Sequence, residues 1–381
     1  MKKTLLAAVI PAIFLSAAAH AQSSVTLYGV IDEGFDFTSN GQGQRGYEMV
    51  SGDTEGSRWG VKGSEDLGSG LKAVFDLENG FNVNSGKLNQ GGAEFGRQAF
   101  VGLSSTQYGT FTMGRQYDPT IDMWSGFTAA GNTMGDLAAH PYDNDNADWD
   151  YNIQNSVKYV SPTYAGFTGE AMYGFSNDAG GFATNRMYSA AGTYKTGGFA
   201  AALAYMKTNN GGANTTGAAT SATTVFTAAS QQNIDAGVSY TFSDKTLLSF
   251  AYSHIDVYNP TANEYFTDQP VAGTQNSWKF DNFEVNGQYF FKPDFWVAAA
   301  YTYTFAHIAT TTGTSVPKYN QFSLMLDYDL SKRTSVYIQG TYEHVNGNTG
   351  TQFDNPVIPG SSGVSSSGNQ LMTRVALMTK F

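Results

Sequence analysis

Two groups of oppositely charged residues carry the chemistry that this sequence can perform. Arg58 and Lys62 alternate with the apolar Trp59 and Val61, so both cations share one face of an extended segment. Residues 116–157 contain no lysine or arginine but seven aspartates, namely Asp118, Asp122, Asp136, Asp143, Asp145, Asp148 and Asp150. A basic surface opposite an acidic segment across a narrow wet space creates a transverse field that orients dipolar solutes. The chemistry expected here is ion selection by fixed charge.

Other motifs that could carry chemistry lack the context that the chemistry needs. The chain has no cysteine, which excludes disulfides and thiolate nucleophiles. Residues 41–46 match the dinucleotide-binding pattern GxGxxG, but no βαβ unit surrounds them. Residues 143–148 faintly resemble a calcium loop without its sixth-position glycine and closing glutamate, so we expect solvated acids, with calcium as the alternative. We therefore expect no cofactor, no metal and no catalytic residue, and the net charge of −11 argues against a nucleic-acid partner.

The elements that must position these charges are β-strands. Apolar and polar residues alternate with period two in many segments, among them 234–242, 283–291, 295–305, 322–328 and 375–381. Short connections lie at 64–70, 161–166, 196–198, 243–245, 292–294 and 330–333. Long polar ones lie near 38–54, 83–93, 118–150, 177–186, 209–232, 259–277, 307–318 and 346–368. Sixteen segments with alternating short and long connections predict an all-β, transmembrane antiparallel barrel, which has no unpaired edge in lipid.

Lipid decides which face of each strand points inward. A lysine or arginine on the lipid face at the membrane midplane costs roughly 2–4 kcal/mol, so the face of Arg58 and Lys62 should line the lumen. Arg97 has the parity opposite to the apolar Phe100, so we expect it to point inward as well. Arg115 either lines the lumen or braces an interface between subunits, and the sequence leaves both open.

The N-terminus has the organisation of an export signal. Lys2 and Lys3 precede an apolar stretch from Leu5 to Ala19, and a small-x-small site ends at Ala21. Cleavage there would leave a single barrel domain of residues 22–381 and, by removing two lysines, change the net charge from −11 to −13. A buried N-terminal helix is the alternative. No later apolar run approaches the ~18 residues of a transmembrane helix.

Several segments resemble the β-proteobacterial general porins of the Burkholderia, Comamonas and Neisseria type. These segments are Ser24–Asp32, Gly56–Gly68, Phe95–Leu103, Met113–Pro119, Asn155–Tyr159 and the terminal Lys380-Phe381. The resemblance implies a homotrimeric, water-filled channel in the Gram-negative outer membrane, in contact with lipid and lipopolysaccharide. It also implies a third loop, about 118–150, that folds inward against constriction arginines at Arg58 and Arg97. Some members of the family carry a further arginine in or just after that loop, and this sequence does not.

The sequence therefore predicts a general porin for passive diffusion of ions and small hydrophilic solutes, and not an enzyme. Its constriction wall is expected to comprise Arg58, Lys62, Arg97 and Arg115, opposite the loop acids Asp118, Asp122 and Asp136. For Asp122 and Asp136 the alternative is a hydrogen bond that braces the loop, or exposure at the mouth. The excess of acids favours a weak cation preference. The alternatives are a solute-selective channel, an outer-membrane barrel enzyme and a soluble periplasmic β-protein.

Overall fold

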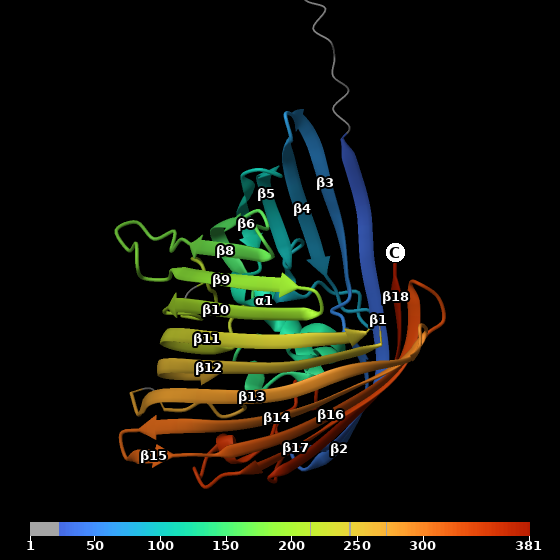
Figure 1. Cartoon of the computed structure of the whole chain (residues 1–381). Coiled ribbons are helices and arrows are strands. Elements are labelled where there is room, and N and C mark those ends of the chain that lie inside the picture. The colour runs from blue at the N-terminus through green and yellow to red at the C-terminus, as the bar shows by residue number, and fades with distance from the viewer. Residues whose placement is uncertain (1–22, 214, 244, 272) are drawn as a thin grey trace, which may run out of the picture.

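The computed structural model describes residues 23–213, 215–243, 245–271 and 273–381, and the expected export signal, residues 1–21, lies outside the described residues. Strands β1 (Ser24–Gly41) and β18 (Asn369–Lys380) pair in antiparallel register, which closes the sheet into a barrel. Figure 1 shows these two strands, blue and red, side by side. The backbone of Gly29 donates to the oxygen of Phe381 at 3.1 Å and accepts from its nitrogen at 3.0 Å, so the chain terminus is part of the seam.

Two of the barrel strands are interrupted. Strands β2 (Gln44–Ser51) and β3 (Arg58–Gly68) both pair with β1, while β15 (Gly313–Ser315) and β16 (Lys318–Asp329) both pair with β14 (Phe295–Thr310). When β2 and β3 are counted as one barrel strand, and β15 and β16 as another, the eighteen described strand segments form sixteen barrel strands. This number confirms the predicted fold class. The remaining strands are β4 (Leu71–Gly80), β5 (Gln98–Ser105), β6 (Gly109–Gln116), β7 (Ile153–Val160), β8 (Phe167–Gly174), β9 (Met187–Thr196), β10 (Phe199–Asn209), β11 (Phe226–Ser243), β12 (Thr246–Asn263), β13 (Gln275–Lys292) and β17 (Thr334–Asn346).

The connections follow the predicted alternation except at two of the expected long loops. The long loop expected near 307–318 is wrong, because β14 continues to Thr310 and β15 begins at Gly313, which leaves a two-residue turn. The long loop expected near 38–54 is wrong, because β1 continues to Gly41 and β2 begins at Gln44. Gln42 and Gly43 have φ of 53° and 87°, the left-handed pair that a tight hairpin turn requires. The irregular segment lies further on, at residues 52–57, where the second barrel strand is interrupted. The sequence did not indicate β2, because the Gly-Gln-Gly-Gln run at 41–44 is polar and the residues that follow do not alternate clearly in hydropathy.

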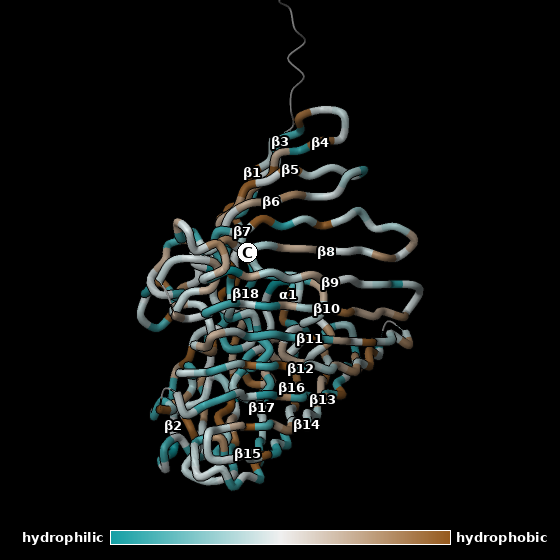
Figure 2. Tube along the Cα trace, turned by 90° about the vertical axis from the view of Figure 1, so that its left-hand side faces the viewer, coloured by the Kyte–Doolittle hydropathy of each residue, from teal (hydrophilic) through white to brown (hydrophobic). Residues whose placement is uncertain are grey.

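The barrel is apolar outside and polar inside. On β16, Phe322 and Leu324 are 52% and 42% exposed, whereas Gln321 and Ser323 are each 2% exposed. Figure 2 shows hydrophilic and hydrophobic residues interleaved along the strands in this way. A soluble protein has the opposite arrangement, so the outer surface is suited to lipid.

Most of the helical turns lie in the segment 117–152, between β6 and β7. They are α1 (Pro119–Met123), η2 (Ser125–Phe127), η3 (Ala130–Met134), η4 (Gly135–Ala138) and η5 (Pro141–Asp143), while η1 (Gln90–Gly92) and η6 (Gln352–Asp354) lie in other loops. Among the described residues, no helix is long and apolar enough to cross a membrane.

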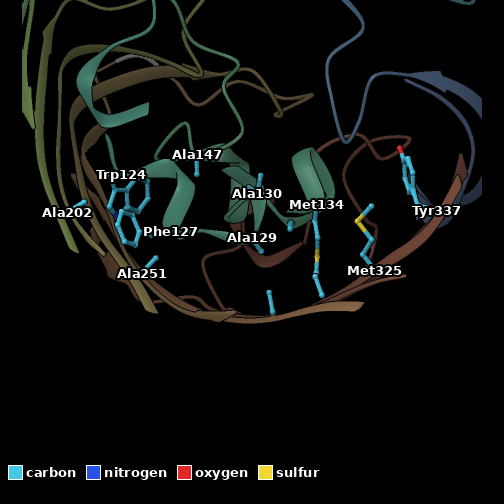
Figure 3. Close-up of a cluster of buried hydrophobic side chains, with 14 of the residues drawn as sticks. Trp124, Phe127, Ala129, Ala130, Met134, Ala147, Ala202, Ala251, Met325 and Tyr337 are labelled. Carbon is cyan, nitrogen blue, oxygen red and sulfur yellow. The ribbon is translucent and has the colours of Figure 1, made fainter. Parts of the chain in front are cut away.

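This segment, the constriction loop, folds into the barrel and packs against its inner wall. Figure 3 shows Trp124, Phe127 and Met134 of the loop against the barrel wall, and Figure 1 places α1 inside the ring of strands. The wall opposite them consists mainly of small side chains, namely Ala202, Ala204, Ala251, Ala298, Ala300 and Ala376, together with the larger Met325 and Tyr337. Even a Cβ added at Gly237 would lie 2.6 Å from the Phe127 ring. The small wall residues therefore make room for the loop.

Candidate constriction site

The tip of the constriction loop is fixed to the interrupted second strand. The backbone nitrogen of Asp136 donates to the carbonyl oxygen of Asp53 at 2.7 Å. The backbone nitrogens of Thr54 and Glu55 donate in turn to Asp32 Oδ2 at 3.0 and 3.2 Å. Gly135 has φ of 59°, and a Cβ there would lie 2.2 Å from the Asp53 oxygen. The break at residues 52–57 thus turns the chain inward to hold the loop.

A buried ion network ties the loop to the opposite wall. His140 Nδ1 lies 2.6 Å from Asp145 Oδ2 and Nε2 lies 3.0 Å from Glu284 Oε2, and all three side chains are 0% exposed. Burial opposes protonation of His140, but the charges and hydrogen bonds of Asp145 and Glu284 outweigh it and raise the pKa of the imidazole to about 10. Glu284 also accepts from the Ala129 backbone nitrogen at 2.7 Å. A protonated His140 therefore joins the loop to β13.

The structure brings Arg58 and Arg97 together through Glu78. Arg97 Nε lies 2.9 Å from Glu78 Oε1, and Arg58 Nε lies 3.5 Å from Glu78 Oε2. Arg58 also pairs with Glu55 at 2.8 Å. Both arginines line a central cavity of about 450 Å³. The prediction that Arg97 points inward assumed that it alternates along a strand with an outward Phe100. Arg97 instead precedes the first residue of β5, and Phe100 itself faces the lumen.

Acids of the constriction loop line the same cavity. Asp136, Asp148 and Asp150 are its loop carboxylates. Desolvation inside the barrel raises the pKa of Asp150, and the charge of Arg97 opposes that rise, which places this carboxylate within electrostatic reach of the basic wall. Burial, reinforced by Asp148 and Asp150, raises the pKa of Asp136 well above its usual range. Among the described residues, the charged groups lining the cavity are Glu55, Asp136, Asp148, Asp150 and Asp327 against Arg58, Arg97 and Lys380.

Lys62 and Asp122 lie in a second lumenal cavity, of about 460 Å³, which Arg58 and Arg97 do not line. Lys62 Nζ lies 4.8 Å from the centre of the Tyr28 ring. Asp122 pairs with Lys158 of β7, which also lies 3.3 Å from Glu170. These residues therefore form a separate charged region of the lumen.

Arg115 and Asp118 line neither of these two cavities. Arg115 lies on the same face of β6 as the exposed Met113. Its Nε donates to the carbonyl oxygen of Gly96 at 2.5 Å. Asp118 caps α1, because its Oδ1 accepts from the backbone nitrogen of Thr120 at 2.8 Å. Burial raises the pKa of Asp118 to about 6. Both side chains brace loop residues in this geometry.

Sequence reasoning missed several charged residues of the lumen. Glu55 and Lys380 are 325 positions apart, and barrel closure brings them to 3.2 Å. Arg374 is 0% exposed and pairs with Asp36 at 2.9 Å and with Asp32 at 3.2 Å. Arg374 could have been found because it alternates with the apolar Val375 and so belongs to the inward face of its strand. Nothing in the sequence indicates which acids surround it.

A closed barrel with an apolar exterior, a charged lumen and an inward loop defines the class of outer-membrane channels. The model of the Gram-negative porin family matches residues 4–348, and the chain belongs to that family. An outer membrane porin protein of Bordetella pertussis is 35% identical over 393 residues, which cover 90% of this chain and 94% of the relative. The major outer membrane protein P.IB of Neisseria meningitidis serogroup B is 33% identical over 218 residues, or 52% of this chain and 57% of the relative.

The fold is also that of solved porins. An anion-selective porin from Comamonas acidovorans superposes with a TM-score of 0.71 at 22% sequence identity, covering 94% of this chain and all of that chain. At this identity the likeness is one of fold. The family and the barrel together place the protein in the Gram-negative outer membrane as a porin.

Proposed function

We propose that this porin is a passive channel for ions and small hydrophilic solutes, with a weak preference for cations and no bond chemistry. The observation that supports this is the central cavity, where five carboxylates and three cationic side chains line one wet space among the described residues. With all eight groups ionised the lining sums to −2, and this excess of carboxylates favours cations. Its aromatic lining comprises Trp149 and Trp296, which is too sparse for a ladder that stacks sugars along the path.

The remaining parts of the proposal follow from the family. The protein is exported with residues 1–21 as its signal, and it assembles as a homotrimer in a bilayer of lipid and lipopolysaccharide. The continuous apolar exterior supports the contact with lipid, since residues such as Phe322 and Val375 (57% exposed) present their side chains outward.

Planar-bilayer recording under a tenfold KCl gradient tests this function. We expect large ohmic steps that close in thirds at high voltage, with a reversal potential that favours K⁺. A potential that favours Cl⁻, as expected of the anion-selective Comamonas porin, would mean that Arg58 and Arg97 outweigh the loop acids. Correctly folded protein that gives no steps would refute the open-channel function.

A further inference from the structure

Three aspartates of the constriction loop converge although residues 143–148 lack the sixth-position glycine and the closing glutamate of a calcium loop. One carboxylate oxygen from each of Asp143, Asp148 and Asp150 lies within 4.8 Å of the other two. Asp143 is 0% exposed, whereas Asp148 is half-buried and Asp150 is exposed. Asp148 and Asp150 also line the central cavity. The cluster therefore combines two carboxylates whose oxygens are buried, those of Asp143 and Asp148, with the exposed Asp150, which an ion in the permeation path can reach.

The buried member of the cluster has no partner of its own. Both carboxylate oxygens of Asp143 lack a hydrogen bond within the described part of the chain, and so do both oxygens of Asp148. An unpartnered buried carboxylate is costly, so these oxygens require either a shared proton or a bound cation.

The nearby basic groups are already engaged. Residues 116–157 contain no lysine or arginine. Arg97, whose charge reaches Asp150, is paired with Glu78 at 2.9 Å. His140 is held between Asp145 and Glu284 at 2.6 and 3.0 Å. The charge of the three aspartates is therefore not balanced by a side chain that is free to turn toward them.

We propose that Asp143, Asp148 and Asp150 form a Ca²⁺ site within the constriction loop. Ca²⁺ binds six to eight oxygens at about 2.3–2.6 Å, so two ligands of one ion lie at most about 5 Å apart. The limit of 4.8 Å among the three oxygens fits that span. Mg²⁺ demands near-ideal octahedral geometry at about 2.0–2.1 Å, whereas Ca²⁺ accepts the irregular geometry of a site built from one loop. Water from the cavity completes the coordination.

The effect of this site on ion selectivity rests on the proposed channel function. Bound Ca²⁺ neutralises Asp148 and Asp150, the loop carboxylates that give the cavity its excess of negative charge. The lining then carries three carboxylates, Glu55, Asp136 and Asp327, against three cationic side chains, so its formal excess of negative charge disappears. Ca²⁺ therefore reduces the cation preference of the channel without any movement of the loop.

Tb³⁺, which replaces Ca²⁺ in oxygen sites, provides a binding assay that does not depend on conduction. Trp149 lies between two of the ligands in sequence and can sensitise Tb³⁺ luminescence in the purified, detergent-solubilised protein. We expect saturable luminescence that CaCl₂ displaces, and at least a tenfold loss of Ca²⁺ affinity in Asp150→Asn and in Asp148→Asn. The matched control is Asp327→Asn, because this acid lines the same cavity from β16 and is outside the cluster.

The outcomes separate the site from the channel function. Absence of saturable Tb³⁺ luminescence, or an equal loss of affinity in Asp327→Asn, would overturn the site even if wild-type channels favour K⁺. In bilayers, CaCl₂ should shift the wild-type reversal potential toward Cl⁻ and leave Asp150→Asn unshifted. Binding that persists in protein that forms no channels would support the site while refuting the proposed function.

Discussion

The charge of the cavity can be tested through one ion pair whose two members have opposite effects. Arg58 and Glu55 pair at 2.8 Å, and both side chains line the central cavity. Burial opposes ionisation of Glu55, but the charges of Arg58 and Lys380 outweigh it and lower the pKa, so this carboxylate is ionised at neutral pH. The variants Arg58→Gln and Glu55→Gln therefore break the same contact, but one removes a positive charge from the lining and the other a negative charge.

The magnitude follows from the size of the cavity. A volume of about 450 Å³ corresponds to a sphere about 5 Å in radius, so one lining charge acts on a permeating ion with about 0.8 kcal/mol at the dielectric constant of water. A Debye length of about 10 Å at 0.1 M salt reduces this to about 0.5 kcal/mol. Cations and anions feel opposite signs, so each substitution changes their relative barrier by about 1 kcal/mol, or about fivefold in the K⁺/Cl⁻ permeability ratio.

Reversal potentials in a tenfold KCl gradient measure this ratio. We expect Arg58→Gln to raise it about fivefold and Glu55→Gln to lower it about fivefold. Lys87→Gln removes an exposed charge outside the cavity lining and serves as the control. Shifts in the same direction for both variants would show that the broken ion pair, and not the lining charge, controls selectivity, and would refute the reasoning.

Three further predictions concern the constriction loop. Gly135→Ala places a Cβ 2.2 Å from the Asp53 oxygen and should release the loop tip, so we expect higher single-channel conductance with more open-channel noise, and an unchanged conductance would contradict the attachment. His140 has a folded-state pKa of about 10, above its ordinary 6.5, so its stabilising contribution is complete below pH 6.5 and disappears as the pH rises through 10. The unfolding temperature should therefore fall over that interval in the wild type and less in His140→Gln. Because burial raises the pKa of Asp136 well above its usual range, the cavity loses the charge of this carboxylate at a higher pH than that of an ordinary aspartate, and on acidification the cation preference measured in bilayers should decline before ordinary aspartates titrate.

The barrel could be predicted because its determinants are local. Alternation with period two and the rhythm of short and long connections lie within single hairpins, and lipid permits few other arrangements for them. Two expected long loops, near 38–54 and 307–318, are wrong, and the first failed because Gln44–Ser51 carries too little hydropathic contrast to indicate a strand.

The site was only partly predictable because it depends on contacts between distant segments. Strand parity indicates that Arg58 and Lys62 share the lumen, but not that they line different cavities. The pairing of Glu55 with Lys380 requires barrel closure. The role of Asp118 as a helix cap depends on α1, a helix of five residues that has no periodicity to detect.

The distribution of partners around the constriction indicates which charges control permeation. The arginines of the basic wall are satisfied by fixed carboxylates, since Glu78 lies 2.9 Å from Arg97 and Glu55 lies 2.8 Å from Arg58. The loop acids Asp148 and Asp150 have no such fixed counter-charge among the described residues, so their ionisation responds to protons and cations in the medium. The variable part of the field therefore belongs to the loop, and the selectivity of this porin should depend on what occupies its carboxylates more than on its arginines.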